Sequence, residues 1–277
     1  EVCRPGDWAA GRLVLHLVNA GSAPASGRLD VWSSHPEAIR FQAAGERRYE
    51  LAPGETRREE IDFEACAQPD RILMVGVRDS GTRFALPVPV RFRYRVEIPR
   101  VGAGATGSAV ELPFIRGAQR VGVLALAIRG GRLELTARAD DLRACPETGP
   151  GNWSGPYVGL LAADVRATST AEVHQVVLFP HGPGRTGTVQ YFIGHREEPA
   201  PAGLEWAAAP APGGWTITAA IPLAALGLTA RSRGFRLEAM INGVLTSGAA
   251  PVLTTLFGSK TARLELKTLA DVAIKGG

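Results

Sequence analysis

The sequence predicts an all-β protein built from two β-sandwich domains, residues 1–98 and 99–277. Segments of alternating apolar and polar residues recur along the chain, separated by turn signals, as is typical of sandwiches of short strands. The 33 glycines and 20 prolines supply enough turn residues for many such connections. No segment keeps a helical period, which excludes a helical bundle and a doubly wound sheet.

The first domain contains about seven short strand signals. Residues 19–22 and 52–55 form turns because they combine Asn, Gly, Ser and Pro. The strands expected here are residues 13–18, 28–32, 49–51, 57–63, 72–77 and 84–94. This number and spacing of strands favours a small sandwich.

Two motifs in this domain carry a family resemblance. One is Leu17-Val18-Asn19-Ala20-Gly21, and the other is Leu51-Ala52-Pro53-Gly54-Glu55. Their order resembles that of the immunoglobulin-like accessory domains of bacterial secreted proteins, over roughly residues 10–92. The resemblance implies a spacer or docking role for this domain.

The second domain opens after a glycine-rich stretch, residues 101–108, which is read as a linker or an exposed loop. Gly130 and Gly131 predict a hairpin turn. The strands expected in this domain are residues 121–128, 133–139, 157–164, 173–179, 188–193, 235–242, 252–257 and 262–266. Residues 197–212 are rich in Pro and Ala, and we expect a loop that holds Trp206.

Residues 213–228 give the clearest local signal in the chain. Trp215, Ile217, Ala219 and Ile221 recur at period 2, so one face of a strand is apolar. Pro222 ends the strand because it has no N–H to donate to the ladder. A short apolar turn, residues 223–228, then closes on glycine.

Four patterns of the second domain occur in the order found in family 9 carbohydrate-binding modules. They are the hairpin 131–141 ending in Asp140-Asp141, the Asn152-Trp153 loop with the strand 157–161, the Ile-Pro landmark of 214–223, and the closing strands 235–242, 257–258 and 264–266. Over about residues 108–268 the chain resembles this family. The resemblance implies a β-sandwich that binds sugars.

The resemblance implies a set of ligand-binding residues. Trp153 matches one of the two tryptophans with which the family clamps a sugar, and Gln175 and Asn242 match polar strand positions. Tyr157 and Trp206 complete the expected set. An aromatic face suits the C–H surface of a sugar ring, and amides suit its hydroxyls.

The chain also departs from the family pattern at three places. Residues 251–256 contain no aromatic side chain to match the second tryptophan. Gly159 and Thr218 stand where acidic residues are common. The alternative reading is therefore a structural or assembly module that has lost its sugar site.

Composition restricts the remaining function classes. The formal net charge is +4, but no basic run with interleaved aromatic residues occurs, so we expect no nucleic-acid partner. No apolar run approaches the roughly 20 residues of a membrane span. Expected partners are polysaccharides or oligosaccharides and other protein subunits or domains. The module type implies a secreted or cell-surface protein of bacterial origin.

The three cysteines, Cys3, Cys66 and Cys145, form no C-x-x-C pair, which disfavours a zinc or redox motif. Cys3 and Cys66 lie in the same expected domain. A disulfide between them is the pairing that we favour from the sequence.

The sequence contains none of the catalytic or cofactor-binding motifs that we considered. His174 and His181 lie on either side of a strand-to-loop passage, and no H-E-x-x-H or G-x-S-x-G pattern occurs. Asp140-Asp141 is a paired-carboxylate site, a calcium site or a solvated hairpin end. Met240 and Lys260 are residue types that ligate haem in some related sandwiches, but nothing in the sequence brings them together. We therefore predict no enzyme, no catalytic residue, no metal and no cofactor, and a non-catalytic carbohydrate-binding accessory module.

Overall fold

The computed structural model describes residues 2–42, 47–68, 72–79, 84–102, 109–116, 119–140, 156–180, 187–211, 214–243, 252–258, 266 and 269–275. It confirms the predicted all-β class, since every regular element longer than four residues is a strand within these ranges. The chain forms two compact units, Glu1–Arg93 and Tyr94–Gly277. The predicted boundary after residue 98 falls inside a strand and stays a prediction.

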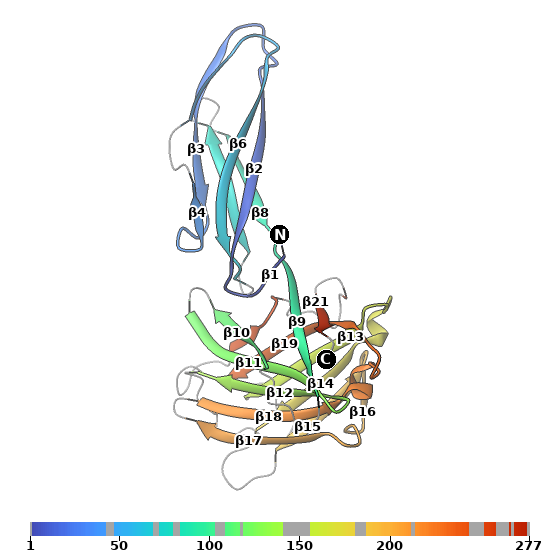
Figure 1. Ribbon diagram of the computed structural model, residues 1–277. Helices are drawn as coiled ribbons and strands as arrows, with labels where there is room; N and C mark the ends of the chain where they lie inside the picture. The colour runs from blue at the N-terminus through green and yellow to red at the C-terminus, as the bar shows by residue number, and fades with distance from the viewer. Residues whose placement is uncertain are drawn as a thin grey trace. The chain divides into compact units, whose positions relative to one another are not determined.

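The first unit contains two antiparallel sheets (Figure 1). One has the strand order β2–β6–β4 and the other β5–β3–β7–β8. The strands of this unit are β1 Val2–Cys3, which belongs to neither sheet, and β2 Trp8–Val18, β3 Ala25–Ser33, β4 Ile39–Phe41, β5 Arg47–Leu51, β6 Thr56–Cys66, β7 Leu73–Asp79 and β8 Phe84–Val90. Seven strands in two sheets match the number expected, whereas the immunoglobulin-like relationship stays a prediction.

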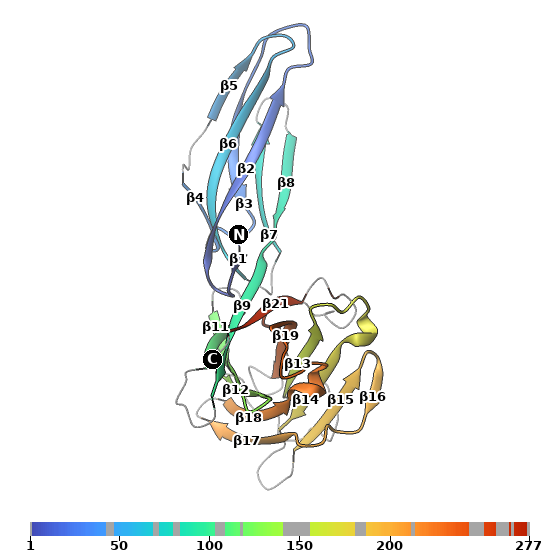
Figure 2. The ribbon, with the colours of Figure 1, turned by 45° about the vertical axis from the view of Figure 1, so that its right-hand side comes forward.

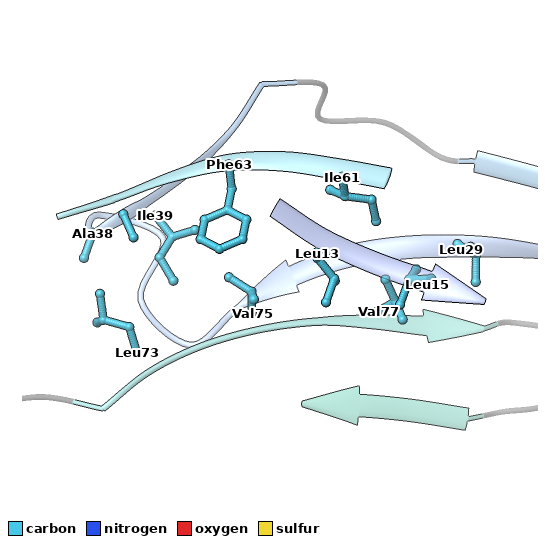
Figure 3. Close-up of a cluster of buried hydrophobic side chains, with 11 residues drawn as sticks. Leu13, Leu15, Leu29, Ala38, Ile39, Ile61, Phe63, Leu73, Val75 and Val77 are labelled. Atoms are coloured by element: carbon cyan, nitrogen blue, oxygen red, sulfur yellow. The ribbon is translucent and has the colours of Figure 1, made fainter. Parts of the chain in front are cut away.

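The core of this unit lies between the two sheets (Figure 3). Leu13 of β2 and Ile61 and Phe63 of β6 face Val75 and Val77 of β7, with Phe63 filling the centre of the cluster (Figure 3). Gly11 is required beside Phe63, because a Cβ at that position would lie 2.4 Å from the ring. The alternation of buried and exposed residues along β2 and β6 produces this packing.

The second unit contains two groups of strands that one strand, β9 (Arg93–Val101), connects. The first group has the order β16–β15–β14–β13–β19–β21, with β20 also beside β19; it is called the β13 sheet below. Its bounds are β13 Tyr157–Asp164, β14 His174–Phe179, β15 Thr188–Ile193, β16 Arg196–Glu198, β19 Gly234–Gly243, β20 Val252–Thr255 and β21 Ala270–Lys275. Figure 2 shows these strands side by side.

The second group has the order β11–β12–β18–β17, with β10 also beside β11; it is called the β12 sheet. Its strands are β10 Val110–Arg116, β11 Gln119–Arg129, β12 Arg132–Ala139, β17 Glu205–Ala211 and β18 Gly214–Pro222. Two short 3-10 helices, η1 Thr170–Glu172 and η2 Leu223–Leu226, lie in connections between strands. β9 pairs in parallel with β21 through Arg95–Pro99 and with β11 at Arg100 and Val101. The two sheets therefore share one strand.

The landmark at β18 and η2 is confirmed. Trp215, Ile217, Ala219 and Ile221 are all buried, as their period-2 spacing predicts. The 3-10 turn of η2 ends on Gly227, whose φ of 69° is in the left-handed region that favours glycine. The hairpin between β11 and β12 is also confirmed, since Gly130 and Gly131 both have positive φ.

The structure corrects the prediction of a loop over residues 197–212. Residues 205–211 form β17, which pairs with β18 along its whole length. β17 is the last strand of its sheet, so Pro210 does not interrupt a ladder on both sides. Trp206 therefore projects from an edge strand.

The favoured disulfide is also corrected, because no disulfide bond joins Cys3 to Cys66 in the described part of the chain. The Sγ atom of Cys3 lies 3.9 Å from the Arg93 carbonyl, and that of Cys66 lies 3.5 Å from the Gly6 carbonyl. Each thiol is thus directed to a backbone oxygen. Cys145 lies outside the described residues.

None of the helices among the described residues is long and apolar enough to cross a membrane.

Candidate functional site

Three of the five residues expected to bind a ligand lie on one face of the β13 sheet. Tyr157 of β13 pairs directly with Asn242 of β19, so their side chains lie on the same face. Gln175 of β14 pairs with Leu161, four positions along β13 from Tyr157. Because side chains alternate at period 2 along a strand, Leu161 and Gln175 lie on that face too.

This shared face is the outer face of the sheet, directed away from the β12 sheet. The opposite face carries Ile241, whose side chain lies against Gly122 of β11: a Cβ on Gly122 would approach Ile241 Cδ1 to 3.0 Å. Odd-numbered positions of β19 thus face the sandwich interior, and the even-numbered Asn242 faces outward. We call the set of outward residues of β13, β14, β15, β19 and β20 the outer face.

The outer face is covered. Tyr157 is 5% exposed, and Gln175 and Asn242 are each 3% exposed. A second hydrophobic cluster spreads over this face, and its buried members are Tyr157, Leu161, Ala163, Ala167, Val173, Val177, Phe179, Met240 and Leu269. The rings of Tyr157 and Phe179 have centroids 5.5 Å apart. Tyr157 is therefore a packing residue that fixes the start of β13.

Unpaired hydrogen-bond acceptors gather on the same face. The Oε1 atoms of Gln175 and Gln190 are buried and have no hydrogen-bond partner among the residues that the structure describes, and neither has Oγ1 of Thr255. Gln190 pairs with Val177 on β14 and Thr255 pairs with Met240 on β19, which places both on the outer face. An unmet buried acceptor costs free energy, so such a cluster points to a ligand or water that completes it.

Gln175 and Gln190 are close neighbours on this face. They lie on adjacent strands in diagonal positions, because Gln175 pairs with Phe192 and Gln190 lies two residues before Phe192. Two amide oxygens in this arrangement can accept hydrogen bonds from vicinal hydroxyls. Sequence reasoning missed Gln190, since its partnership with Gln175 depends on the register of β14 and β15.

A buried carboxylate, Glu238 of β19, is the second residue that sequence reasoning missed. It is fully buried and lies opposite Leu161 on the outer face. Its Oε1 accepts hydrogen bonds from the backbone N–H groups of Leu256 and Phe257, at 3.0 and 2.9 Å. Glu238 therefore holds the turn that follows β20.

The space above Gly159 on the outer face is filled. A Cβ at Gly159 would lie 2.8 Å from Met240 Cγ and 3.2 Å from its Sδ. The Met240 side chain thus occupies the space above the central strand β13. Lys260, the other residue considered for haem, lies outside the described residues.

Trp206 does not lie on the outer face. It projects from the edge strand β17 and is half-buried. A Cβ at Gly187 would lie 2.0 Å from its Cη2 atom and 2.9 Å from the Phe179 carbonyl. The indole therefore packs over Gly187, beside the end of the β13 sheet that carries Tyr157 and Asn242.

Trp153 lies outside the described residues, as do Asp141 and His181. The ligand-binding role of Trp153 stays a prediction.

The side chain of His174, on β14, packs between Tyr191 and the end of η2. His174 Nδ1 lies 2.8 Å from the Tyr191 hydroxyl, and the imidazole packs under Gly227 at the end of η2. Burial lowers the pKa of His174, and a hydrogen bond with the Ala225 backbone opposes this shift. His174 is thus a half-buried neutral side chain that supports the landmark turn.

Asp140 forms ion pairs with Arg138 at 3.0 Å and Arg120 at 3.5 Å, both largely exposed. For Asp140 this arrangement is that of a solvated hairpin end, and the prediction for the Asp140-Asp141 pair stays a prediction because Asp141 lies outside the described residues. Among the described residues, no three His, Cys, Asp or Glu side chains gather so that they could hold a metal ion.

Solved structures similar to this chain include a family 9 carbohydrate-binding module from Caldicellulosiruptor kristjanssonii, in complex with cellotriose and in complex with glucose. Sequence identity is 13% and 12%, and the TM-scores are 0.48 and 0.49. The match covers 66% of this chain in both cases, and 94% and 96% of the modules. No family model matches the chain, and neither does any curated protein.

Proposed function

We propose that the second unit is a non-catalytic module that binds an oligosaccharide or polysaccharide at the Tyr157–Asn242 edge of the β13 sheet. Trp153 supplies the aromatic platform for a sugar ring. The amides of Gln175, Gln190 and Asn242 supply hydrogen-bonding groups for its hydroxyls. The observation that carries the proposal is the pair of unmet acceptors, Gln175 Oε1 and Gln190 Oε1, on the face that holds Asn242.

The burial of these amides sets a condition on binding. A sugar reaches them only when the side chains that cover the outer face move, so binding is coupled to a local rearrangement of that cover. Such coupling lowers affinity, because the closed form dominates without ligand. We therefore expect weak binding that is detected more readily with polymeric glycans, where several contacts act together.

The test is affinity electrophoresis and calorimetry of the full chain against a panel of soluble and insoluble neutral glycans. We expect Trp153→Ala to abolish retention by the glycan that binds the unchanged protein. Trp8→Ala is the matched control, because Trp8 is an exposed tryptophan of the first unit, 37% exposed, and lies outside the proposed site. Equal binding by the Trp153→Ala variant, or no binding to any glycan of the panel, would overturn the proposal.

A second candidate function is a structural or assembly module that no longer binds sugar. Met240 above Gly159 and the apolar cluster over the outer face favour it, because they fill space that a ligand would need. In this case the immunoglobulin-like first domain and the second unit form a scaffold in a secreted or cell-surface protein. Light scattering separates the two functions: an oligomer that binds no glycan supports the scaffold, and a monomer that binds a glycan contradicts it.

A further inference from the structure

A pocket lined by three arginines lies in the second unit, far from the proposed sugar site. Its volume is about 450 Å³, and its lining residues are Arg100, Ala230, Arg231, Ser232, Arg233 and Ile274. Its lining residues come from the segment before β19 and from the ends of β9 and β21. Asn242 is eight positions along β19 from Gly234, which corresponds to about 26 Å of strand.

The turn before β19 is held rigid by its own side chains. The backbone N–H of Thr229 donates to Ser232 Oγ at 3.0 Å, and the backbone N–H of Arg231 donates to Thr229 Oγ1 at 3.3 Å. The backbone of Ser232 donates to the Thr229 carbonyl at 3.1 Å. Arg231 and Arg233 therefore extend from a backbone with a fixed shape.

Arg100 is oriented by the same turn. Its two terminal nitrogens donate to the carbonyls of Ala230, at 2.8 Å, and Ser232, at 3.1 Å. Its Nε is buried and has no hydrogen-bond partner within the described part of the chain. A guanidinium carries five N–H donors, so this clamp leaves donors for another group.

The lining of the pocket is positively charged. All three titratable lining residues are arginines, and no carboxylate is among the lining residues. No ion pair joins Arg231 or Arg233 to an acidic side chain within the described ranges. Elsewhere in this unit exposed arginines are commonly paired, as Arg132 is with Glu205 and Arg138 is with Asp140. Three like charges around one concavity raise its affinity for an anion.

We propose that this pocket is an oxyanion subsite that takes the carboxylate or sulfate group of an acidic glycan. Arginine suits these groups because its planar fork matches two oxygens of a carboxylate or sulfate. The assignment of the oxyanion to a glycan rests on the proposed function. The affinity for an oxyanion rests on the pocket alone. Arg231 and Arg233 bind the oxyanion, and Arg100 holds the turn that presents them.

The test is affinity electrophoresis of the full chain in gels that contain polygalacturonate, dextran sulfate or neutral dextran. We expect retention by one or both acidic polymers, weakening steeply as salt rises because the contact is ionic. The double variant Arg231→Gln/Arg233→Gln should bind at least about tenfold more weakly, the loss expected for about 1.4 kcal/mol. The acidic polymer that retains the protein shows whether the pocket selects a carboxylate or a sulfate.

The matched control is Arg120→Gln/Arg138→Gln, which removes the same charge from exposed arginines of the same unit. It should change retention less than twofold. Equal losses in both double variants would overturn the proposal, because they would show a response to net charge alone. Selectivity for a glycan would be overturned if the chain bound double-stranded DNA as tightly as the acidic polymers and the Arg231→Gln/Arg233→Gln variant lost that binding too.

The result is separable from the test of the sugar site. Trp153→Ala should leave retention by the acidic polymer unchanged, since the two places lie at opposite ends of β19. Loss of neutral-glycan binding with retained polyanion binding would remove the proposed function and keep the oxyanion pocket. No retention by either acidic polymer would overturn the pocket, whatever the neutral panel shows.

Discussion

The side-chain amide of Asn19 donates from Nδ2 to the carbonyl of Leu51, at 3.1 Å. It thereby joins the two turn motifs that stand out in the sequence of the first domain. The Asn19 amide also reaches the carbonyls of Ala23 and Ala52, and its backbone carbonyl accepts from Gly54. One buried side chain thus fixes two turns against each other.

We expect Asn19→Ala to destabilise the first unit by about 1–3 kcal/mol, because it leaves buried carbonyls without a donor. Urea denaturation followed by tryptophan fluorescence measures this change. Ser22→Ala, at an exposed position of the same turn, is the control and should stay within about 0.5 kcal/mol of the unchanged protein. If Asn19→Ala lowered the free energy of unfolding by less than about 0.5 kcal/mol, the two turns would keep their arrangement without the Asn19 side chain.

Substitutions at Gly227 and Gly131 distinguish the cost of backbone strain from the cost of a steric clash. Both have positive φ, 69° and 77°. A Cβ at Gly131 meets nothing within 4 Å, whereas a Cβ at Gly227 lies 2.6 Å from His174 Nε2. We expect Gly131→Ala to cost about 1–2 kcal/mol from backbone strain alone. Gly227→Ala should cost clearly more. Thermal unfolding of both variants checks the order, and equal losses would show that His174 moves aside freely.

The half-buried His174 makes stability depend on pH. Burial lowers its pKa in the folded state, so below a pH of about 6.5 the unfolded chain takes up a proton that the folded chain resists. This contribution to stability is complete above the unfolded pKa and is lost as the pH falls through the folded pKa. His174→Gln should therefore reduce the fall in Tm between pH 7.5 and pH 5.

His195 serves as the control for this prediction, because it is an exposed histidine of the same unit. Its replacement by Gln should leave the pH profile of Tm as it was. An unchanged profile in the His174→Gln variant would show that other groups set the acid limit of stability.

Gln175→Leu distinguishes a ligand-binding role from a structural one. The Oε1 atom of Gln175 has no hydrogen-bond partner among the described residues, so an apolar side chain of similar size removes an unmet acceptor. We expect Tm to stay equal or rise while glycan binding falls at least about tenfold. A lower Tm with unchanged binding would assign Gln175 to the packing of the sheet.

Much of the strand pattern could be predicted from the sequence. The bounds expected for β13 and β15 agree with the structure, because both segments are apolar runs or alternations of the right length between clear breaks. β17 was missed because its Ala and Pro residues carry no β-propensity signal. Its strand character comes from backbone pairing with β18, which a local pattern does not contain.

The site was predictable only in part for a related reason. Tyr157, Gln175 and Asn242 were predicted one by one as ligand-binding residues, and the pairing of three strands places them on one face. Their role in binding stays a prediction. Gln190 and Glu238 were missed because only that register reveals their place. The burial of the two amides was not predictable, since strand polars are expected at a surface. Here a second apolar layer covers the face where they lie.

The parallel pairing of β9 with β21 has a consequence for the order of folding. β9 opens the second unit and β21 comes at its far end, so their ladder joins the most distant segments of that unit. Contacts between distant segments form slowly, because a long loop must close before they contribute. While β21 is undocked, the Arg95–Pro99 side of β9 is an unpaired strand edge, and a newly made chain is most at risk of aggregation during that interval.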